Sequence, residues 1–440
     1  MQTRRRFVIT GALASATSAL GESRSAKAAA SERIRIGIMG AGGRALALIQ
    51  SFAANPNIEI VGIAEVDSSR LPAGLEAAKK HQITSIRPEA DFRRLIDDRS
   101  IDALVIGTPD HWHAIPTILA CQAGKDVYVE KPDAHNIVEG QAMVKAMRKH
   151  GRIVQLGSQH RSTTRLQSAI DYVSAGHLGR CLVAKAWEST RQGPIGFPKD
   201  EAVPKEVDYD MWLGPAPKRP FNRNRFHSRW RWFFDYGTGD LGNDGVHRLD
   251  MALALLDAAA GAQREPTLGL PRTISAGGGK WYFDDAQEFA DTLQITYSFG
   301  HGRLSKILTY EMRIWAPYKY LGEPEGAAVF GDRGYIVIGN NDWVAYGQGG
   351  QELARGSGDS SEIPHVQNFV DCIKSRNKPN CDLETIGHVA SVLCHTGNIA
   401  SRVGRTLTLD PETEQFINDG EANELRGRTS YRAPWLLPDV

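Results

Sequence analysis

The stretch IRIGIMGAGGRALALIQ, residues 34–50, decides the fold of this 440-residue chain. An apolar run leads into three small residues at GxGxxG spacing, Gly40, Gly42 and Ala45, and then into a segment with helical periodicity. Such a strand–turn–helix order lets the backbone approach a pyrophosphate, which the helix N-terminus favours through its free N–H groups and dipole. A glycine turn alone is weak evidence, so the interpretation depends on the sequence around it.

The next apolar run, IEIVGIAEV at 58–66, supplies that support, because it ends in an acid, Glu65. A carboxylate at this position can hydrogen-bond both ribose hydroxyls of a dinucleotide and repels a 2′-phosphate. The pattern therefore favours NAD over NADP, although Arg70 nearby is compatible with NADP. The residues predicted to hold the cofactor at this turn are Gly40, Gly42, Gly43, Arg44 and Glu65.

Short apolar runs alternate with amphipathic stretches as far as residue 157. This rhythm is typical of a parallel sheet that is covered by helices on both faces. We predict strands at 34–38, 58–66, 101–108, 126–130 and 152–157, and helices at 43–54, 71–81, 113–123 and 137–150. Residues 31–157 are thus expected to form a dinucleotide-binding α/β domain.

The rhythm changes after residue 157, and a long stretch at 191–240 is irregular and rich in Pro, Gly, Arg and aromatic residues. Several later runs alternate polar and apolar residues between glycine-rich turns, which indicates antiparallel strands. We predict strands at 181–190, 273–283, 290–299, 302–315 and 326–339, and helices at 246–256, 362–375 and 384–402. Residues 158–440 are expected to form an α+β domain with a mainly antiparallel sheet that binds the substrate.

The N-terminus reads as a targeting segment. Three arginines, Arg4, Arg5 and Arg6, precede a weakly apolar stretch, 7–20, and small residues follow at 26–30. Residues 1–30 are therefore predicted to be a signal peptide that resembles the twin-arginine type, with an ordinary secretory signal or an uncleaved anchor as alternatives. The expected location is periplasmic or secreted, and no other segment is apolar and long enough to span a bilayer.

The composition is that of an ordinary globular protein and does not indicate nucleic-acid binding. The formal net charge is +1, the apolar fraction 41% and the charged fraction 23%, with no basic run that would indicate nucleic-acid binding. The five cysteines are scattered without a CxxC pair, so we expect no metal site and mostly buried free thiols, with a Cys372–Cys381 bridge left open.

Three further motifs follow the glycine turn in order: GTPDHWHAI at 107–115, YVEKP at 128–132 and GDLGNDGVHRLDMA at 239–252. Together they closely resemble the Gfo/Idh/MocA family, named for glucose–fructose oxidoreductase and inositol dehydrogenase. The resemblance implies a Rossmann domain followed by an α+β domain, and an NAD(P)-dependent oxidoreductase that acts on a sugar or polyol hydroxyl. It also implies a homo-oligomer.

The resemblance assigns catalytic roles to Lys131 and His247. Lys131 would lie near the nicotinamide, hold the reacting hydroxyl and stabilise negative charge as its proton leaves. His247 would exchange that proton. The family commonly has an aspartate four residues before this histidine, where this chain has Asn243 beside Asp244. Either a neighbouring aspartate takes the carboxylate's role, or the chemistry differs from simple dehydrogenation.

Other positions are expected to line the same crevice, because the carboxyl ends of parallel strands meet there. The additional residues predicted for the cofactor are Thr108, Pro109, His113, Glu130, Lys131 and Gln159. Those predicted for the carbohydrate substrate are Arg161, Trp230, Trp232, Asp240 and His247. The aromatic-rich segment at 225–237 is interpreted as a sugar-stacking wall, with core packing as the alternative.

Export adds a constraint, since free NAD is not expected to be replenished outside the cytoplasm, whereas a folded protein can carry bound NAD with it. The main hypothesis is an oxidoreductase with tightly bound NAD. One alternative is an NAD-dependent glycoside hydrolase that works by oxidation, elimination, hydration and reduction. Another is a non-catalytic carbohydrate-binding protein.

Overall fold

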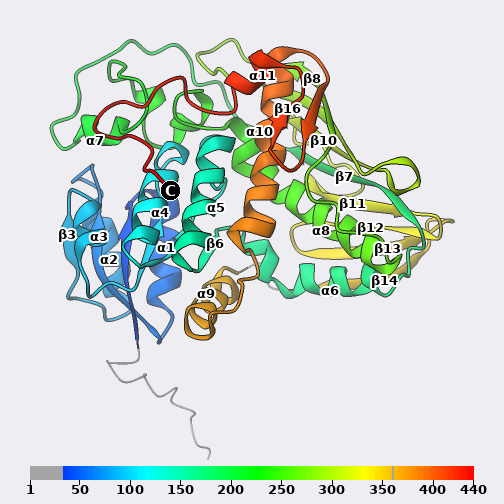
Figure 1. Ribbon diagram of the computed structural model, residues 1–440, viewed down its shortest axis with the longest axis horizontal. Helices are drawn as coiled ribbons and strands as arrows, with labels where there is room; N and C mark the ends of the chain where they lie inside the picture. Colours follow the sequence, from blue (N-terminus) through cyan, green and yellow to red (C-terminus); the bar gives the residue numbers. More distant parts are fainter. Residues whose placement is uncertain (1–32, 359–360) are drawn as a thin grey trace, which may run out of the picture.

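The computed structural model describes residues 33–358 and 361–440. The predicted signal peptide, 1–30, lies outside the described residues. Two sheets organise the chain, a parallel sheet in the N-terminal part and a larger, mainly antiparallel sheet in the C-terminal part (Figure 1). The predicted fold class is confirmed.

The first sheet has six parallel strands in the order β3-β2-β1-β4-β5-β6. Its strands are β1 (Ile34–Met39), β2 (Ile58–Ala64), β3 (Arg87–Glu89), β4 (Ala103–Ile106), β5 (Asp126–Val129) and β6 (Val154–Leu156). The helices that cover it are α1 (Gly43–Ala53), α2 (Leu71–Lys79), α3 (Arg93–Asp97), α4 (Ala114–Gln122) and α5 (Ile137–His150). Every residue of β4 and β5 is buried, as the near-continuous apolar runs predict. The strand order reverses between β1 and β4, which opens a crevice at their carboxyl ends.

The second sheet has ten strands in the order β14-β13-β12-β11-β7-β10-β9-β8-β15-β16. Its strands are β7 (Cys181–Ser189), β8 (Thr273–Gly279), β9 (Thr292–Phe299), β10 (Lys306–Arg313), β11 (Glu325–Gly331), β12 (Gly334–Ile338), β13 (Asp342–Gly347), β14 (Glu352–Ser357), β15 (Leu407–Asp410) and β16 (Gln415–Phe416). The helices of this half are α6 (Thr164–Ser174), α7 (Tyr209–Leu213), α8 (Val246–Ala262), α9 (Ile363–Ser375), α10 (His388–Val403) and α11 (Gly420–Glu424). Strands β7 and β10 pair in parallel, and the neighbouring pairs run antiparallel.

The structure differs from the sequence prediction at several elements. The segment predicted as one strand at 326–339 is a hairpin of β11 and β12, because the chain turns at Asp332 and Arg333. Helix α6 was not predicted, although Thr163 caps it by accepting a hydrogen bond from the Leu166 N–H. The sequence also does not predict β3 and β13 to β16, because β3, β15 and β16 have only two to four residues, β13 does not alternate, and β14 is an edge strand without buried residues.

Helix α10 joins the two halves of the molecule. It packs against α5 of the first domain and against α8 and β8 of the second, and it runs between the two sheets in Figure 1. Eleven of its residues are buried, as expected of a helix that is covered on several sides. Its first residue, His388, contacts Asp133, which follows the predicted catalytic Lys131 by two positions.

All five cysteines are buried free thiols, so Cys372 and Cys381 do not form a bridge. Among the described residues, no helix combines the length and apolar character needed to cross a membrane.

Candidate active site

The glycine turn lies between β1 and α1, as the sequence predicts. Gly40 has φ +103°, which favours glycine, and a Cβ there would come within 3.1 Å of the Gly107 carbonyl oxygen. No side chain caps the N-terminus of α1, where the N-cap is Gly42. Beside this N-terminus lies a cleft of about 450 Å³ that Gly40, Gly42, Gly43 and Arg44 line. The turn therefore presents backbone and a helix N-terminus to open space.

Glu65 lines the same cleft at the end of β2. Its carboxylate accepts hydrogen bonds from the Ala41 N–H at 2.6 Å and the Asp67 N–H at 2.9 Å. Burial raises the pKa of Glu65 above its ordinary value, against the opposing effect of these hydrogen bonds. Arg70 and Asp67 line the cleft nearby, so this end of it carries both signs of charge.

The opposite wall of the cleft comes from the irregular segment of the second domain. Trp212, Phe226, Trp230 and Arg231 line the cleft from that side. Thr108, Pro109 and Trp112 complete it at the end of β4. Of the residues assigned to the sugar-stacking wall, Trp230 borders the cleft, whereas Trp232 is 4% exposed and packs in the hydrophobic core. The core-packing alternative is therefore correct for Trp232.

Arg44 is held between two carboxylates. Its guanidinium donates to Glu130 at 2.8 Å and also pairs with Glu362, which lies just before α9. Burial alone would lower the pKa of Arg44, but the carboxylates of Glu130 and Glu362 raise it. Glu362 was not predicted, because no local signal connects it with a residue 318 positions away.

Lys131 and Asn243 meet across the two domains. The Lys131 ammonium donates to the main-chain oxygen of Asn243 and, at 3.4 Å, to its side-chain Oδ1. The peptide bond between Lys131 and Pro132 is cis. His113 supports this loop, since its ring nitrogens contact the carbonyl oxygens of Pro132 at 2.7 Å and Thr108 at 3.0 Å. Both nitrogens of His113 are thus occupied and it does not line the cleft, so its observed role is to position the loop.

His247 lies one helical turn after Asn243 and is 7% exposed. Its Nδ1 atom has no hydrogen-bond partner among the described residues, and its ring packs edge-on against His160 at 5.1 Å. Burial and the nearby Lys131 charge lower the pKa of His247 well below its ordinary value. The imidazole is therefore neutral near pH 7 and has a nitrogen free to accept a proton.

Two predicted ligand-binding residues are placed differently. Arg161 forms a bidentate ion pair with Asp250 of α8, with an Nε–Oδ2 distance of 2.8 Å and an Nη2–Oδ1 distance of 2.6 Å. Its guanidinium is thus neutralised inside the protein, and the prediction that it contacts substrate is not supported. Gln159 is half-buried in the turn after β6 and does not line the cleft; its Oε1 atom has no hydrogen-bond partner.

Asp240 and Asp244 converge with a third carboxylate, Glu188 of β7. Asp240 is 1% exposed, and the Asn243 amide donates to Asp240 at 3.4 Å and to Asp244 at 2.9 Å. Glu188 was not predicted, because its place depends on how β7 packs against the helix that carries the aspartates.

Two family models match the chain and together cover more than half of it. Residues 34–158 match the Gfo/Idh/MocA oxidoreductase family with an NAD-binding Rossmann fold. Residues 183–265 and 358–437 match the C-terminal alpha/beta domain of the same oxidoreductase family.

The individual relatives match only part of this chain. Levoglucosan dehydrogenase of Pseudarthrobacter phenanthrenivorans is 23% identical over 258 residues, which are 56% of this chain and 57% of the relative. A glycosyl hydrolase family 109 protein of Solibacter usitatus is 32% identical over 112 residues, 24% of this chain and 26% of the relative. The chain thus spans about half the length, or less, of these curated relatives. A structure of levoglucosan dehydrogenase in complex with NADH and levoglucosan has the same fold, with a TM-score of 0.64 at 19% identity over 86% of this chain and 99% of that chain.

The residues of the cleft fit NAD. The Gly40 backbone is in a conformation that residues with a side chain rarely adopt, and a Cβ at Gly43 would meet open space, so a pyrophosphate can approach the turn. Gly42 and the N-terminus of α1 would bind its charge, and Glu65 is placed at the strand end where the ribose hydroxyls are bound.

Proposed function

Because the chain belongs to the Gfo/Idh/MocA family of oxidoreductases, we propose that it oxidises a hydroxyl group of a sugar or polyol and uses tightly bound NAD. The observation that carries this proposal is the contact between Lys131 of the first domain and Asn243, one helical turn before His247 of the second. The Lys131 ammonium and the His247 imidazole thus belong to two domains that meet at Asn243, and neither side chain lines the cleft itself.

NAD, when bound, supplies the hydride acceptor for the carbon that is oxidised. The ammonium of Lys131 holds the hydroxyl oxygen and stabilises the negative charge that grows on it. His247 takes the hydroxyl proton on its unpartnered Nδ1, and its lowered pKa keeps the imidazole in the neutral, proton-accepting form. Asn243 keeps the Lys131 side chain in place through two acceptor oxygens.

Two substitutions test these roles. Lys131→Met removes the charge and His247→Asn removes the proton acceptor, so each is expected to lower kcat by roughly 10²–10⁴-fold. Both variants should retain bound NAD, measured by mass spectrometry of the denatured protein. Lys185→Met removes the lysine of an ion pair in the ten-stranded sheet and is the matched control. This variant should keep the wild-type activity. Turnover near the wild-type value in both site variants would refute the assignment.

We further propose that the protein leaves the cytoplasm in folded form with its NAD. The support is the sequence around Arg4 and Arg5, which resembles a twin-arginine signal. Replacing both residues by lysine should trap the precursor in the cytoplasm, as measured by fractionation and immunoblotting. Unimpaired export of that variant would argue against this route.

A closed redox cycle is the second candidate function. The similarity to a glycosyl hydrolase family 109 protein and the amide of Asn243 in place of a carboxylate favour it. In such a cycle a sugar hydroxyl is transiently oxidised, the adjacent C–H loses its proton and the aglycone is eliminated. Water then adds, and the retained hydride reduces the carbonyl again, so there is no net oxidation.

One assay distinguishes the two candidates. A closed cycle releases the aglycone from an aryl glycoside without added NAD, and in D₂O it incorporates deuterium at the carbon beside the transient ketone. A dehydrogenase instead converts its bound NAD to NADH, one equivalent per sugar oxidised, and needs that NADH to be exchanged or reoxidised by a second carbonyl substrate before it turns over again. Aglycone release without any deuterium incorporation would contradict the cycle.

A further inference from the structure

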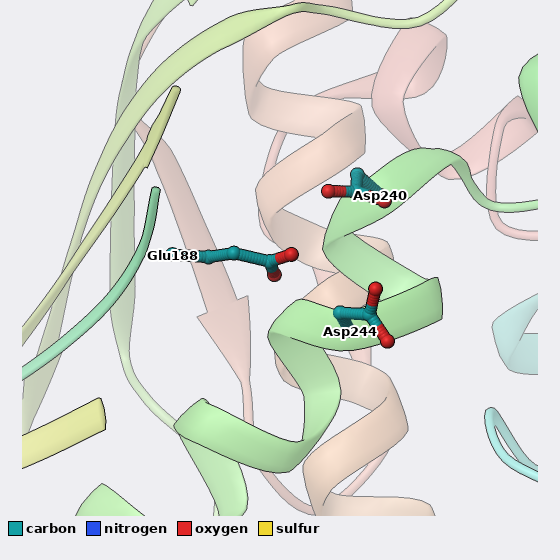
Figure 2. Close-up of side chains that lie close together, drawn as sticks. All are labelled: Glu188, Asp240 and Asp244. Carbon is teal, nitrogen blue, oxygen red and sulfur yellow. The ribbon is translucent and has the colours of Figure 1, made fainter. Parts of the chain in front are cut away.

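Three carboxylates converge at the start of α8, beside the proposed catalytic residues. Asp240 is the N-cap of a π-helical turn, Leu241–Gly245, Asp244 lies within that turn, and Glu188 reaches toward both from β7 (Figure 2). One oxygen of each carboxylate lies within 4.8 Å of an oxygen of both others. Glu188 and Asp240 are each 1% exposed, and Asp244 is half-buried. We call Glu188, Asp240 and Asp244 the carboxylate cluster.

Among the described residues, 33–358 and 361–440, no cationic side chain forms an ion pair with this cluster. None of the three carboxylates forms an ion pair, and the nearby Arg248 is paired with Glu325 at 2.7 Å. Burial and the neighbouring aspartates raise the pKa of Glu188 well above its ordinary value, and burial with Asp244 raises the pKa of Asp240 to about 6. Buried charges in proteins are normally paired or bind a metal, so the cluster requires a counter-charge or a proton.

Unpartnered groups point into the same space. No group outside the cluster donates to either oxygen of Glu188, whose contact is with the Asp240 carboxyl group, and the hydroxyl of Tyr310, a side chain only 1% exposed, also lacks a partner. Tyr310 belongs to β10, whose pairing with β7 places it on the same sheet face as Glu188. Its hydroxyl lies against Gly245, where a Cβ would come within 2.5 Å of it, and the cluster's charge helps to raise its pKa. A fully buried hydroxyl and two fully buried carboxylate oxygens thus have no partner outside the cluster around this one spot.

We propose that Glu188, Asp240 and Asp244 bind a hard divalent cation of the Mg²⁺, Mn²⁺ or Ca²⁺ class. All three ligands are carboxylate oxygens, which these ions prefer, and the set contains no histidine or cysteine that would favour zinc or copper. Oxygens around one such ion, at bond lengths of about 2.0–2.6 Å, lie no more than about 5 Å apart, and the three carboxylates have oxygens that all lie within 4.8 Å of one another. Asp244, the half-buried member, provides the side from which ion and water enter.

The cation would act on the active site through Asn243. The Asn243 Nδ2 atom donates to both aspartates of the cluster, while its Oδ1 and main-chain oxygens accept from Lys131. Fixing Asp240 and Asp244 therefore fixes the orientation of the amide that positions the Lys131 ammonium. A divalent ion also offsets the negative charge that the cluster places beside this lysine. The binding site itself does not depend on the proposed oxidoreductase activity.

The competing explanation is a proton shared between Glu188 and Asp240. A carboxylic acid next to a carboxylate relieves the repulsion without a metal, as in paired carboxyl groups elsewhere. The two explanations differ in what stabilises the protein, because a cation makes stability depend on its concentration, whereas a shared proton makes it depend only on pH.

Direct binding is the first test. Bound metal is first removed from the full-length protein with EDTA. The protein is then titrated with Mn²⁺, and binding is measured by calorimetry and by the loss of the EPR signal of the free ion. We expect one site per chain, with Mg²⁺ and Ca²⁺ competing for it. Glu188→Gln and Asp240→Asn should each weaken the affinity by about 100-fold, while Glu311→Gln, an ion-paired carboxylate of β10 outside the cluster, should not change it.

Thermal stability is the second test, and it can also be measured for variants that fold poorly. Mn²⁺ should raise the Tm of the wild type and of Glu311→Gln, but not that of the two cluster variants. In EDTA, Asp240→Asn should be at least as stable as the wild type, because one repelling charge has been removed. The absence of stoichiometric binding of all three ions by the wild type, or full affinity in both cluster variants, would overturn the proposal. The absence of binding together with a Tm that depends on pH alone would establish the shared proton instead.

Discussion

Replacing His388 by glutamine is expected to remove much of the pH dependence of stability at alkaline pH. His388 opens α10 and is 5% exposed. Its Nδ1 contacts Asp133 at 2.6 Å, and its Nε2 contacts Glu414 at 3.1 Å. Asp133 is fully buried two residues after Lys131, so this ion pair also holds the loop that carries Lys131 against the helix that joins the two domains.

The magnitude follows from proton linkage. Burial alone would lower the pKa of His388, but Asp133 and Glu414 raise it to about 10. In the unfolded chain the pKa is about 6.5, so the folded state keeps a proton that the unfolded state loses. The contribution is fully present below pH 6.5 and is lost as the pH rises through about 10. It is on the order of 4–5 kcal/mol, of which roughly 2–3 kcal/mol disappears between pH 7 and pH 9.

Urea unfolding of the wild type and of His388→Gln, from pH 6 to pH 10, measures this effect. At pH 6 the variant should be less stable by about 3–5 kcal/mol, since Asp133 is left buried without its cation. The difference should narrow toward zero at pH 10. His301→Gln, at an exposed histidine, is the control and should follow the wild type. Parallel curves for the wild type and His388→Gln over this pH range would refute the reasoning.

Three further outcomes are expected. Glu65→Ala should weaken NAD binding by about tenfold or more, because a charged hydrogen-bond acceptor is lost, and weaken NADP less; fluorescence titration measures both, and a wild type that prefers NADP would contradict the assignment. Arg161→Met should destabilise the fold by about 3–5 kcal/mol by leaving Asp250 unpaired, with KM little changed; a raised KM at unchanged stability would restore a substrate role. Trp232→Ala should cost about 3–5 kcal/mol in denaturant unfolding, whereas Trp230→Ala should mainly weaken cofactor binding, and equal stability losses in both would contradict their placement.

The first domain could be predicted from the sequence because its signals are local. The run 34–50 specifies strand, turn and helix within one supersecondary unit, and Gly40 is required by the backbone conformation that it adopts. Buried parallel strands read as continuous apolar runs, so β4 and β5 were recognisable as well. The resemblance to the family also identifies Lys131 and His247 as candidates, although no local pattern connects the two domains that carry them.

The sequence by itself thus determined the fold class, the glycine turn and the candidate lysine and histidine. Only the tertiary structure decided which charges meet. Arg44 is paired with Glu362, Arg161 is neutralised inside the protein, and Glu188 joins the aspartates near His247. Each of these contacts depends on strand order and helix packing between segments that are far apart in the chain. Periodicity reports only which face of an element is buried, and it carries no information about which distant side chain that face will meet.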